Sequence, residues 1–197
     1  MSPKSRGRPP GRGRSRRPAS GQRPPRRVQT APGWQAEEIT DCWFDEPLAG
    51  DRRAWAAPSG HGTYQGLELE ALDPHDEGEL TFLLEAQHLA WAEALEGDEN
   101  VLGADGEPMS PRLHVTMHMV IANQLLADEP PETWQTVQRL AGLGYDWHNV
   151  MHLIMGPVAE SVRQTLAEQR PFDRADYLRR LAELPGDFPS PEELGLR

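Results

Sequence analysis

Two histidines four residues apart, His114 and His118, are the side chains of this sequence best placed to do chemistry together. The run around them is typical of a helix, because Ser110 is a good N-cap, Pro111 suits the first helical position and apolar residues recur at helical spacing. Residues at i and i+4 lie on one helix face, with Cβ atoms about 5–6 Å apart. The pair can therefore offer two imidazoles to one metal ion or metal pair.

The same arrangement returns at His148 and His152, where Asp146 can cap a second helix. Four of the seven histidines thus fall into two HxxxH pairs on two predicted helices. A third predicted helix carries Glu85 and His88 at ExxH spacing, which helical di-iron carboxylate proteins use to present a carboxylate beside an imidazole. The joint pattern predicts a metal site with the HxxxH histidines as primary ligands.

A further carboxylate, Glu160, follows His152 on the same predicted helix. In an ideal helix of 3.6 residues per turn it would lie about 80° off the histidine face. Pro157, between the two, is tolerated only with a kink or a locally widened turn, which could bring the carboxylate round. The secondary ligand candidates are therefore His88, Glu85 and Glu160.

Such ligands would be neutral imidazoles and carboxylates, which suit a divalent transition metal among Fe, Zn, Mn, Ni and Cu, with Fe and Zn foremost. Five or more nitrogen and oxygen ligands would favour a two-metal or non-haem iron site over a closed structural zinc. Metal affinity should weaken as the pH falls through the histidine range near 6.5. The alternative is that these histidines lie on helix surfaces or at the core edge and only form hydrogen bonds.

Cysteine content and hydropathy exclude several classes of protein. Cys42 is the only cysteine, so neither an intramolecular disulfide nor a Cys-rich zinc site can form. No apolar run approaches 18 residues, and the basic N-terminus lacks the apolar core of a secretory signal. We therefore expect a cytoplasmic protein that does not contact a membrane.

The net charge of −11 conceals two regions of opposite sign. Residues 1–27 hold ten Lys or Arg and no Asp or Glu, which leaves ten basic and 31 acidic residues after them, a net charge of −21. The cationic arm has little to bury and should be disordered. Its Arg6-Gly7-Arg8-Pro9 run resembles an AT-hook, which lies in the narrow A·T minor groove. The arm could equally be a generic polyanion-binding or solubilising segment.

Helix and turn signals divide the chain into a disordered arm at 1–33, an irregular tryptophan-containing lead-in at 34–72, a helical histidine-rich domain at 73–184 and a loose tail at 185–197. No persuasive series of strands appears. The fold class is all-α, a compact bundle preceded by the arm. Five helices are predicted, at 73–97, 110–127, 131–143, 146–168 and 173–184.

The order of these features resembles the bacterial domain-of-unknown-function 1841 family. The likeness covers roughly residues 64–184 and rests on Leu72-Asp73-Pro74, Glu85 to His88, the Pro111 to His118 helix and the His148 to His152 pair followed by Glu160. Family members typically have Asn-Pro where this chain has Ser110-Pro111, and some carry a His-Pro-Glu run with a further His that is missing here. The resemblance implies a helical architecture and a candidate site, but no reaction.

Two functions from different classes remain open. The helical domain is either a metalloprotein, enzyme or sensor, or a non-catalytic interaction module that the basic arm delivers to nucleic acid. The two functions are not mutually exclusive, because the arm and the core are separable. No P-loop, nucleophile elbow or dinucleotide-binding glycine pattern is present, and no general base is specific enough to name a reaction.

Overall fold

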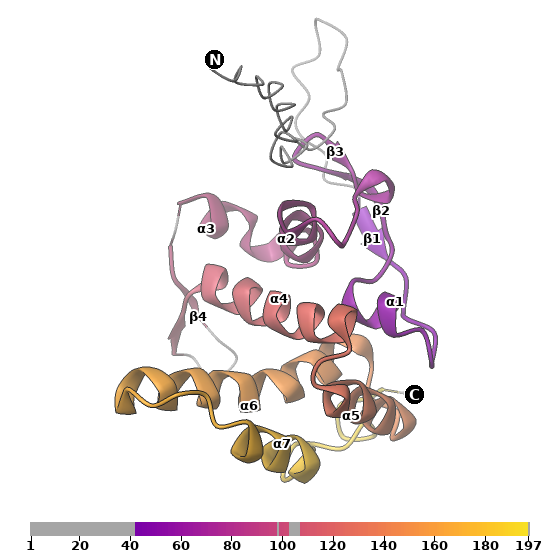
Figure 1. Cartoon of the computed structure of the whole chain (residues 1–197). Coiled ribbons are helices and arrows are strands. Elements are labelled where there is room, and N and C mark those ends of the chain that lie inside the picture. Colours follow the sequence, from indigo (N-terminus) through magenta and orange to yellow (C-terminus); the bar gives the residue numbers. More distant parts are fainter. Residues whose placement is uncertain (1–41, 98, 103–106, 197) are drawn as a thin grey trace, which may run out of the picture.

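A single helix, α4 (Pro111–Ala127), organises the fold. The computed structural model describes residues 42–97, 99–102 and 107–196. In Figure 1, α4 crosses the middle of the molecule, with α2 and α3 on one side and α6 and α7 on the other. It packs against α1, α2, α3, α5 and α6. Side chains on its buried face are therefore brought near several other elements at once.

Four of the predicted helices are confirmed almost to the residue, as α4, α5 (Pro131–Gly142), α6 (Trp147–Glu168) and α7 (Arg174–Glu183). Their starts are set locally. The Ser110 side chain accepts a hydrogen bond from the Leu113 amide, and Asp146 and Asp173 cap α6 and α7 in the same way. Pro131 opens α5 at a position where its missing N–H has no partner to lose.

The predicted helix at 73–97 is broken into three pieces, so that prediction is wrong in its continuity. Asp76 caps α2 (Glu77–Ala86), which is followed by a 3-10 turn, η2 (Leu89–Trp91), and by α3 (Ala92–Gly97). His88 lies at the break with φ −120° and ψ 44°, outside the helical region. Its side chain therefore points where a residue within a continuous helix would not.

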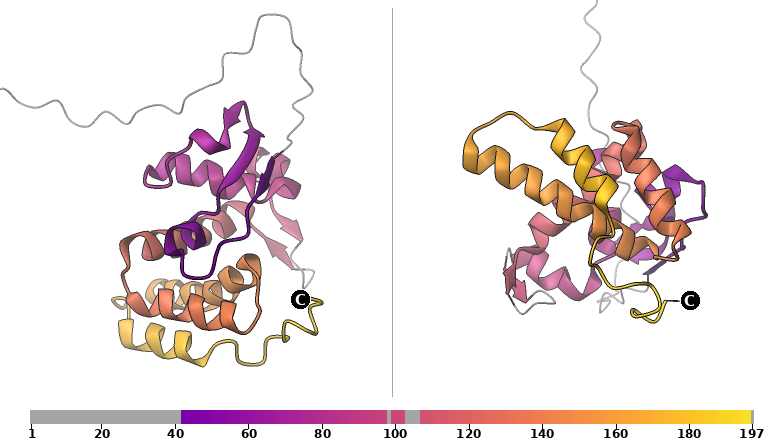
Figure 2. Two further views of the ribbon diagram at one scale, coloured as in Figure 1. Left: turned by 90° about the vertical axis from the view of Figure 1, so that its right-hand side faces the viewer. Right: turned by 90° about the horizontal axis from the view of Figure 1, so that it is seen from below.

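Short strands are the main departure from the predicted all-α class. β1 (Cys42–Phe44), β2 (Gly60–Tyr64) and β3 (Leu67–Glu68) form an antiparallel sheet, with helix α1 (Arg52–Ala56) between the first two and a 3-10 turn, η1 (Leu69–Ala71), after the last. β4 (Val101–Leu102) pairs with β5 (Pro108–Met109). A Cβ on Gly60 would come within 2.8 Å of the Phe44 ring, so this sheet needs a glycine there. The bundle remains mostly helical, as Figure 2 shows.

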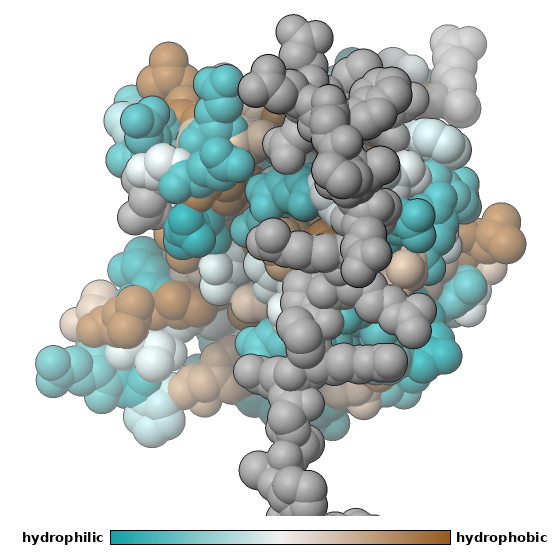
Figure 3. Space-filling model, turned by 90° about the horizontal axis from the view of Figure 1, so that it is seen from above, coloured by the Kyte–Doolittle hydropathy of each residue, from teal (hydrophilic) through white to brown (hydrophobic). Residues whose placement is uncertain are grey.

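The core lies between α4 and its neighbours. Its fully buried members include Leu80 and Leu84 from α2, Ile121 and Leu125 from α4, and Ile154 from α6. Seen from above, the surface that is not grey carries hydrophobic residues only in patches among hydrophilic ones (Figure 3). Among the helices that the structure describes, none combines the length and the apolar character needed to cross a bilayer.

The C-terminal segment after α7 is attached to the bundle. The Tyr145 hydroxyl donates a hydrogen bond to the Pro189 carbonyl over 3.0 Å, and the Tyr145 and Phe188 rings lie 6.0 Å apart. The predicted basic arm and its Arg6-Gly7-Arg8-Pro9 run lie outside the described residues, as does the first part of the predicted lead-in.

Candidate metal centre

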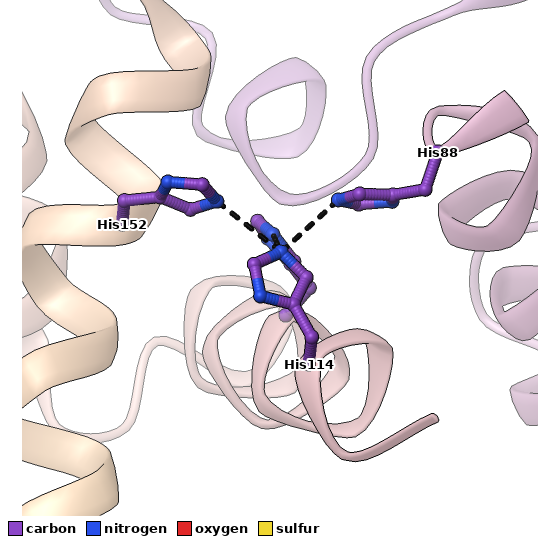
Figure 4. A group of neighbouring side chains, drawn as sticks. His88, His114 and His152 are labelled. Carbon is purple, nitrogen blue, oxygen red and sulfur yellow. Dashed lines mark hydrogen bonds between the residues drawn. The ribbon is translucent and has the colours of Figure 1, made fainter. Parts of the chain in front are cut away.

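Four histidines from three elements meet beside the buried face of α4: His88 at the end of α2, His114 and His118 on α4, and His152 on α6. We call them the histidine cluster. One possible ligand nitrogen from each lies within 4.8 Å of those of the other three. Figure 4 shows the side chains of His88 and His152 approaching His114 from opposite sides.

The Nε2 atom of His114 is the centre of the cluster. It lies 3.0 Å from Nε2 of His118, and 3.2 Å from Nε2 of both His88 and His152. Two nitrogens bound to one ion at about 2.05 Å in a tetrahedron would be roughly 3.3 Å apart. These separations are therefore close to those of ligands that share a single metal ion.

Hydrogen bonding alone cannot account for these three contacts. A neutral imidazole nitrogen either carries one proton and donates it, or has one lone pair and accepts. His114 Nε2 can therefore satisfy only one of its three neighbours at a time. The four nitrogen atoms therefore lie close together without enough protons to form a hydrogen bond at each contact.

The second ring nitrogens of two members differ in their partners. His88 Nδ1 lies 2.7 Å from the Leu84 carbonyl oxygen, which only accepts, so Nδ1 carries the proton and the lone pair of Nε2 points into the cluster. This is the usual second contact of a metal-binding histidine. His118 is 0% exposed, and its Nδ1 is buried without any hydrogen-bond partner.

Burial keeps these imidazoles uncharged. It lowers the pKa of His114 to about 3 and that of His152 to about 4, with neighbouring histidines adding to both shifts. Burial also lowers the pKa of His88, and that of His118 falls well below its ordinary value. The cluster is therefore neutral at pH 7, the form that binds metals. In the folded chain, protons should therefore compete with a metal for these four imidazoles only below pH 6.5, a lower range than the sequence predicted.

Two tryptophans that the sequence analysis did not assign to the site enclose the cluster. Trp91 stacks on His88 with ring centroids 5.1 Å apart and meets the edge of His114 at 4.9 Å. Trp147 stacks on His118 at 5.6 Å and is held by a hydrogen bond from its Nε1 to the Trp55 carbonyl. The sequence signal that could have found these tryptophans was their position. Trp91 follows the predicted ligand His88 by three residues, and Trp147 directly precedes the predicted ligand His148.

Three predicted ligands lie outside the cluster. His148 is exposed at its edge, with its ring centroid 4.0 Å from that of His152, and its pKa is lowered chiefly by desolvation. Burial raises the pKa of Glu85, which the Arg112 charge partly offsets. The Glu160 carboxylate accepts hydrogen bonds from Arg163 and Gln164, and Arg163 is the main cause of its low pKa, about 2. No described carboxylate joins the four imidazoles.

One side of the cluster opens into a cavity of about 990 Å³, which we call the entrance cavity. Three cluster members, His88, His114 and His152, line it, whereas His118 lies behind them and does not. His148 also contributes to the wall. The remaining lining is largely apolar, with residues from β1, from the segment after α2, from β4 and β5, and from α6: Phe44, Leu89, Trp91, Leu102, Met109 and Met155.

A family model described as domain of unknown function DUF1841 matches residues 78–183, which is more than half of the chain. The matched region runs from the start of α2 to the end of α7 and contains the whole histidine cluster. No curated protein and no solved structure matches the chain.

Proposed function

The chain belongs to the DUF1841 family, whose description names no activity, and we propose from its own geometry that it is a metalloprotein. The histidine cluster would hold one divalent transition metal ion, with Fe and Zn the first candidates, through the Nε2 atoms of His88, His114, His118 and His152. The observation that carries this proposal is the triple contact of His114 Nε2 at 3.0–3.2 Å, which hydrogen bonds cannot satisfy.

A single ion fits the ligand number better than a pair. Two-metal sites place their ions about 3.5–4 Å apart and need more donors than one tetrahedron supplies. The cluster offers four nitrogens, and the described carboxylates are not part of it. The five or more ligands that the sequence suggested would have favoured a two-metal or non-haem iron site, whereas the four nitrogens that come together are enough for one ion.

The entrance cavity favours an enzyme over a sensor or a structural site. Structural zinc sites are closed on all sides by protein ligands, whereas catalytic sites keep an open position for a reactant. Here three of the four imidazoles line a cavity of about 990 Å³, so an ion held by all four would have room for a fifth ligand on that side. A bound ion would act there as a Lewis acid or a redox centre, according to which metal the cell supplies.

Elemental analysis of the full chain, purified without an affinity tag or chelator, tests the proposal. We expect about one equivalent of metal in the native protein and almost none in His114→Ala. His61→Ala is the matched control, because this partly buried histidine pairs with Asp45 and Glu70 instead. Equal metal content in both variants, or a native chain that is folded but takes up none of Fe, Zn, Mn, Ni and Cu, would refute a metal centre.

The basic arm supports a second, independent proposal, polyanion binding. Ten positive charges within residues 1–27 would release counterions from nucleic acid, so affinity for a DNA or RNA duplex should fall steeply with salt. Deleting residues 1–27 should abolish this binding, while His114→Ala should leave it unchanged. Binding that survives the deletion would move the interaction to the acidic bundle and contradict the arm's role.

A further inference from the structure

We propose that the ligand of this metal centre is a monocarboxylate with an apolar body, which sets its carboxylate on the metal and its body in the entrance cavity. The inference rests on the proposed metal centre and adds the class of molecule that it binds. Three features of the described residues support it: the charge of the cluster, the lining of the cavity and a polar side chain without a partner.

The charge of the cluster favours an anionic ligand. An imidazole that binds a metal through its lone pair carries no charge, so four of them leave a divalent ion with its full charge of +2 in a buried place. Burying a charge without a counter-charge is costly. Since no described carboxylate joins the cluster, an anion that arrives through the cavity would supply compensation at the metal itself. A carboxylate is a ligand suited to such metals.

The lining of the cavity limits how many charges the ligand carries. Its walls are mainly apolar, with Phe44, Leu89, Trp91 and Met155 among the larger side chains. Neither lysine nor arginine occurs among the described lining residues, and Glu107 adds a negative charge. A phosphate or a second carboxylate would therefore find no cation beyond the metal. One anionic group and an apolar remainder match these walls.

Gln87 supplies a third observation. Its amide nitrogen and oxygen are both buried without a hydrogen-bond partner, although the residue lines the cavity beside His88. A buried amide in this state is costly unless something completes it. The Gln87 Nε2–H can donate to the carboxylate oxygen that does not bind the metal. A ligand that coordinates through one oxygen and accepts this hydrogen bond with the other would compensate the charge of the metal and give the Gln87 Nε2–H a partner.

One face of α6 forms a wall of the cavity, where His152, Met155, Gly156 and Ala159 follow at helical spacing. Ala159 is exposed, so a longer side chain there would extend into the cavity without entering the core. Ala159→Leu should therefore obstruct the ligand's body and leave the imidazoles in place. Ala182→Leu is the matched control, an equally exposed alanine on α7 that does not line the cavity.

The experiment uses the full chain loaded with Co²⁺, whose visible spectrum reports both metal uptake and changes in its ligands. Octanoate, acetate, octan-1-ol and inorganic phosphate are titrated separately. We expect a Kd for octanoate at least tenfold below that for acetate, since about two buried methylene groups account for such a factor. Octan-1-ol, which lacks the anion, and phosphate, which lacks the apolar body, should also bind at least tenfold more weakly than octanoate.

The variants separate the two parts of the ligand. Ala159→Leu should raise the Kd for octanoate at least tenfold and leave the Kd for acetate and the uptake of Co²⁺ unchanged. Gln87→Leu should raise the Kd of both carboxylates by about tenfold or more, the size of a lost hydrogen bond to a charged group. Ala182→Leu should change nothing.

Failure of this inference is distinct from failure of the metal centre. A folded chain that takes up neither Co²⁺ nor any of Fe, Zn, Mn, Ni and Cu refutes both. A chain that binds Co²⁺ but has equal affinity for octanoate and acetate, or prefers phosphate, refutes only the proposed ligand class. Octanoate binding that Ala159→Leu leaves unaltered would also overturn it, since the apolar body would then lie elsewhere.

Discussion

Replacing His118 with leucine should change the stability of the metal-free protein little and lower the stability of the metal-loaded protein. His118 is 0% exposed, and its Nδ1 is buried without a partner. An unsatisfied buried polar atom costs about 1–3 kcal/mol of folding free energy. Leucine has a similar size and no polar atoms, so His118→Leu removes this cost from the metal-free protein.

Two losses reduce the gain. The stack of His118 on Trp147 disappears, which costs about 0.5–1.5 kcal/mol, and the change of shape costs less than about 1.5 kcal/mol. These losses of about 0.5–3 kcal/mol offset most of the gain of about 1–3 kcal/mol, so we expect metal-free His118→Leu to be close to the native chain in stability. A buried residue kept only for packing would instead give a clear loss, typically about 0.5–3 kcal/mol.

With metal bound, the native chain should be more stable than His118→Leu. A ligand that binds only the folded chain at one hundred times its Kd stabilises it by about 2.7 kcal/mol. The native chain should receive this gain and His118→Leu should lose most of it, because the variant lacks one of four ligands. Unfolding in urea, followed once with a chelator and once with saturating Zn²⁺, gives both differences.

Met151→Leu serves as the control for these measurements. Met151 is also 0% exposed and lies on α6, but it has no donor in the cluster, so its stability change should be the same with and without metal. The reasoning is refuted if His118→Leu destabilises the metal-free chain by more than about 1 kcal/mol and by the same amount in Zn²⁺. His118 would then be a packing residue.

Two further predictions follow from the electrostatics. The folded pKa values of His114, about 3, and His152, about 4, lie below the ordinary 6.5, so below pH 6.5 the unfolded chain takes up protons first and the metal-free protein loses stability. Each of the two histidines should lower the free energy of unfolding by about 2 kcal/mol between pH 6.5 and 5. The measurement is the urea midpoint, which should be lower at pH 5. Equal midpoints at pH 7.5 and pH 5 would contradict the burial argument. Glu160→Gln should retain full metal content by elemental analysis, because its carboxylate pairs with Arg163 outside the cluster; metal loss in this variant would place Glu160 among the ligands.

Helices with local start signals could be predicted from the sequence. Ser110 and Asp146 cap α4 and α6 with hydrogen bonds that span three residues, and such contacts are visible in the order of residues alone. The break after Ala86 was not visible, because neither glycine nor proline marks it. The strands were missed for a different reason. They have two to five residues each and exist only through pairing, too short to show an alternating pattern.

Four of the seven predicted ligands come together in the structure, and helix geometry explains which ones do. HxxxH spacing places two histidines on one helix face but does not say which of them reaches a neighbouring helix. On α4, which lies at the centre of the bundle, both His114 and His118 reach the cluster. On α6 only His152 does, while His148 remains exposed one turn earlier. His88, a secondary candidate from sequence, joins through the break that sequence did not show.

The same burial explains both the cost of the cluster and its use. If apolar residues replaced the four imidazoles, the metal-free bundle would lose few hydrogen bonds. Among the recorded contacts of these four side chains, only that of His88 Nδ1 is a hydrogen bond to a group outside the cluster. Positions where a sequence departs from the preference for apolar residues in a core, without a gain in packing, are typical of functional sites. Desolvation holds the pKa values of His114 and His152 low, and this keeps their lone pairs free for a metal at neutral pH. A chain selected for stability alone would have no reason to keep these four residues together, whereas a metal that binds only the folded state would offset their cost.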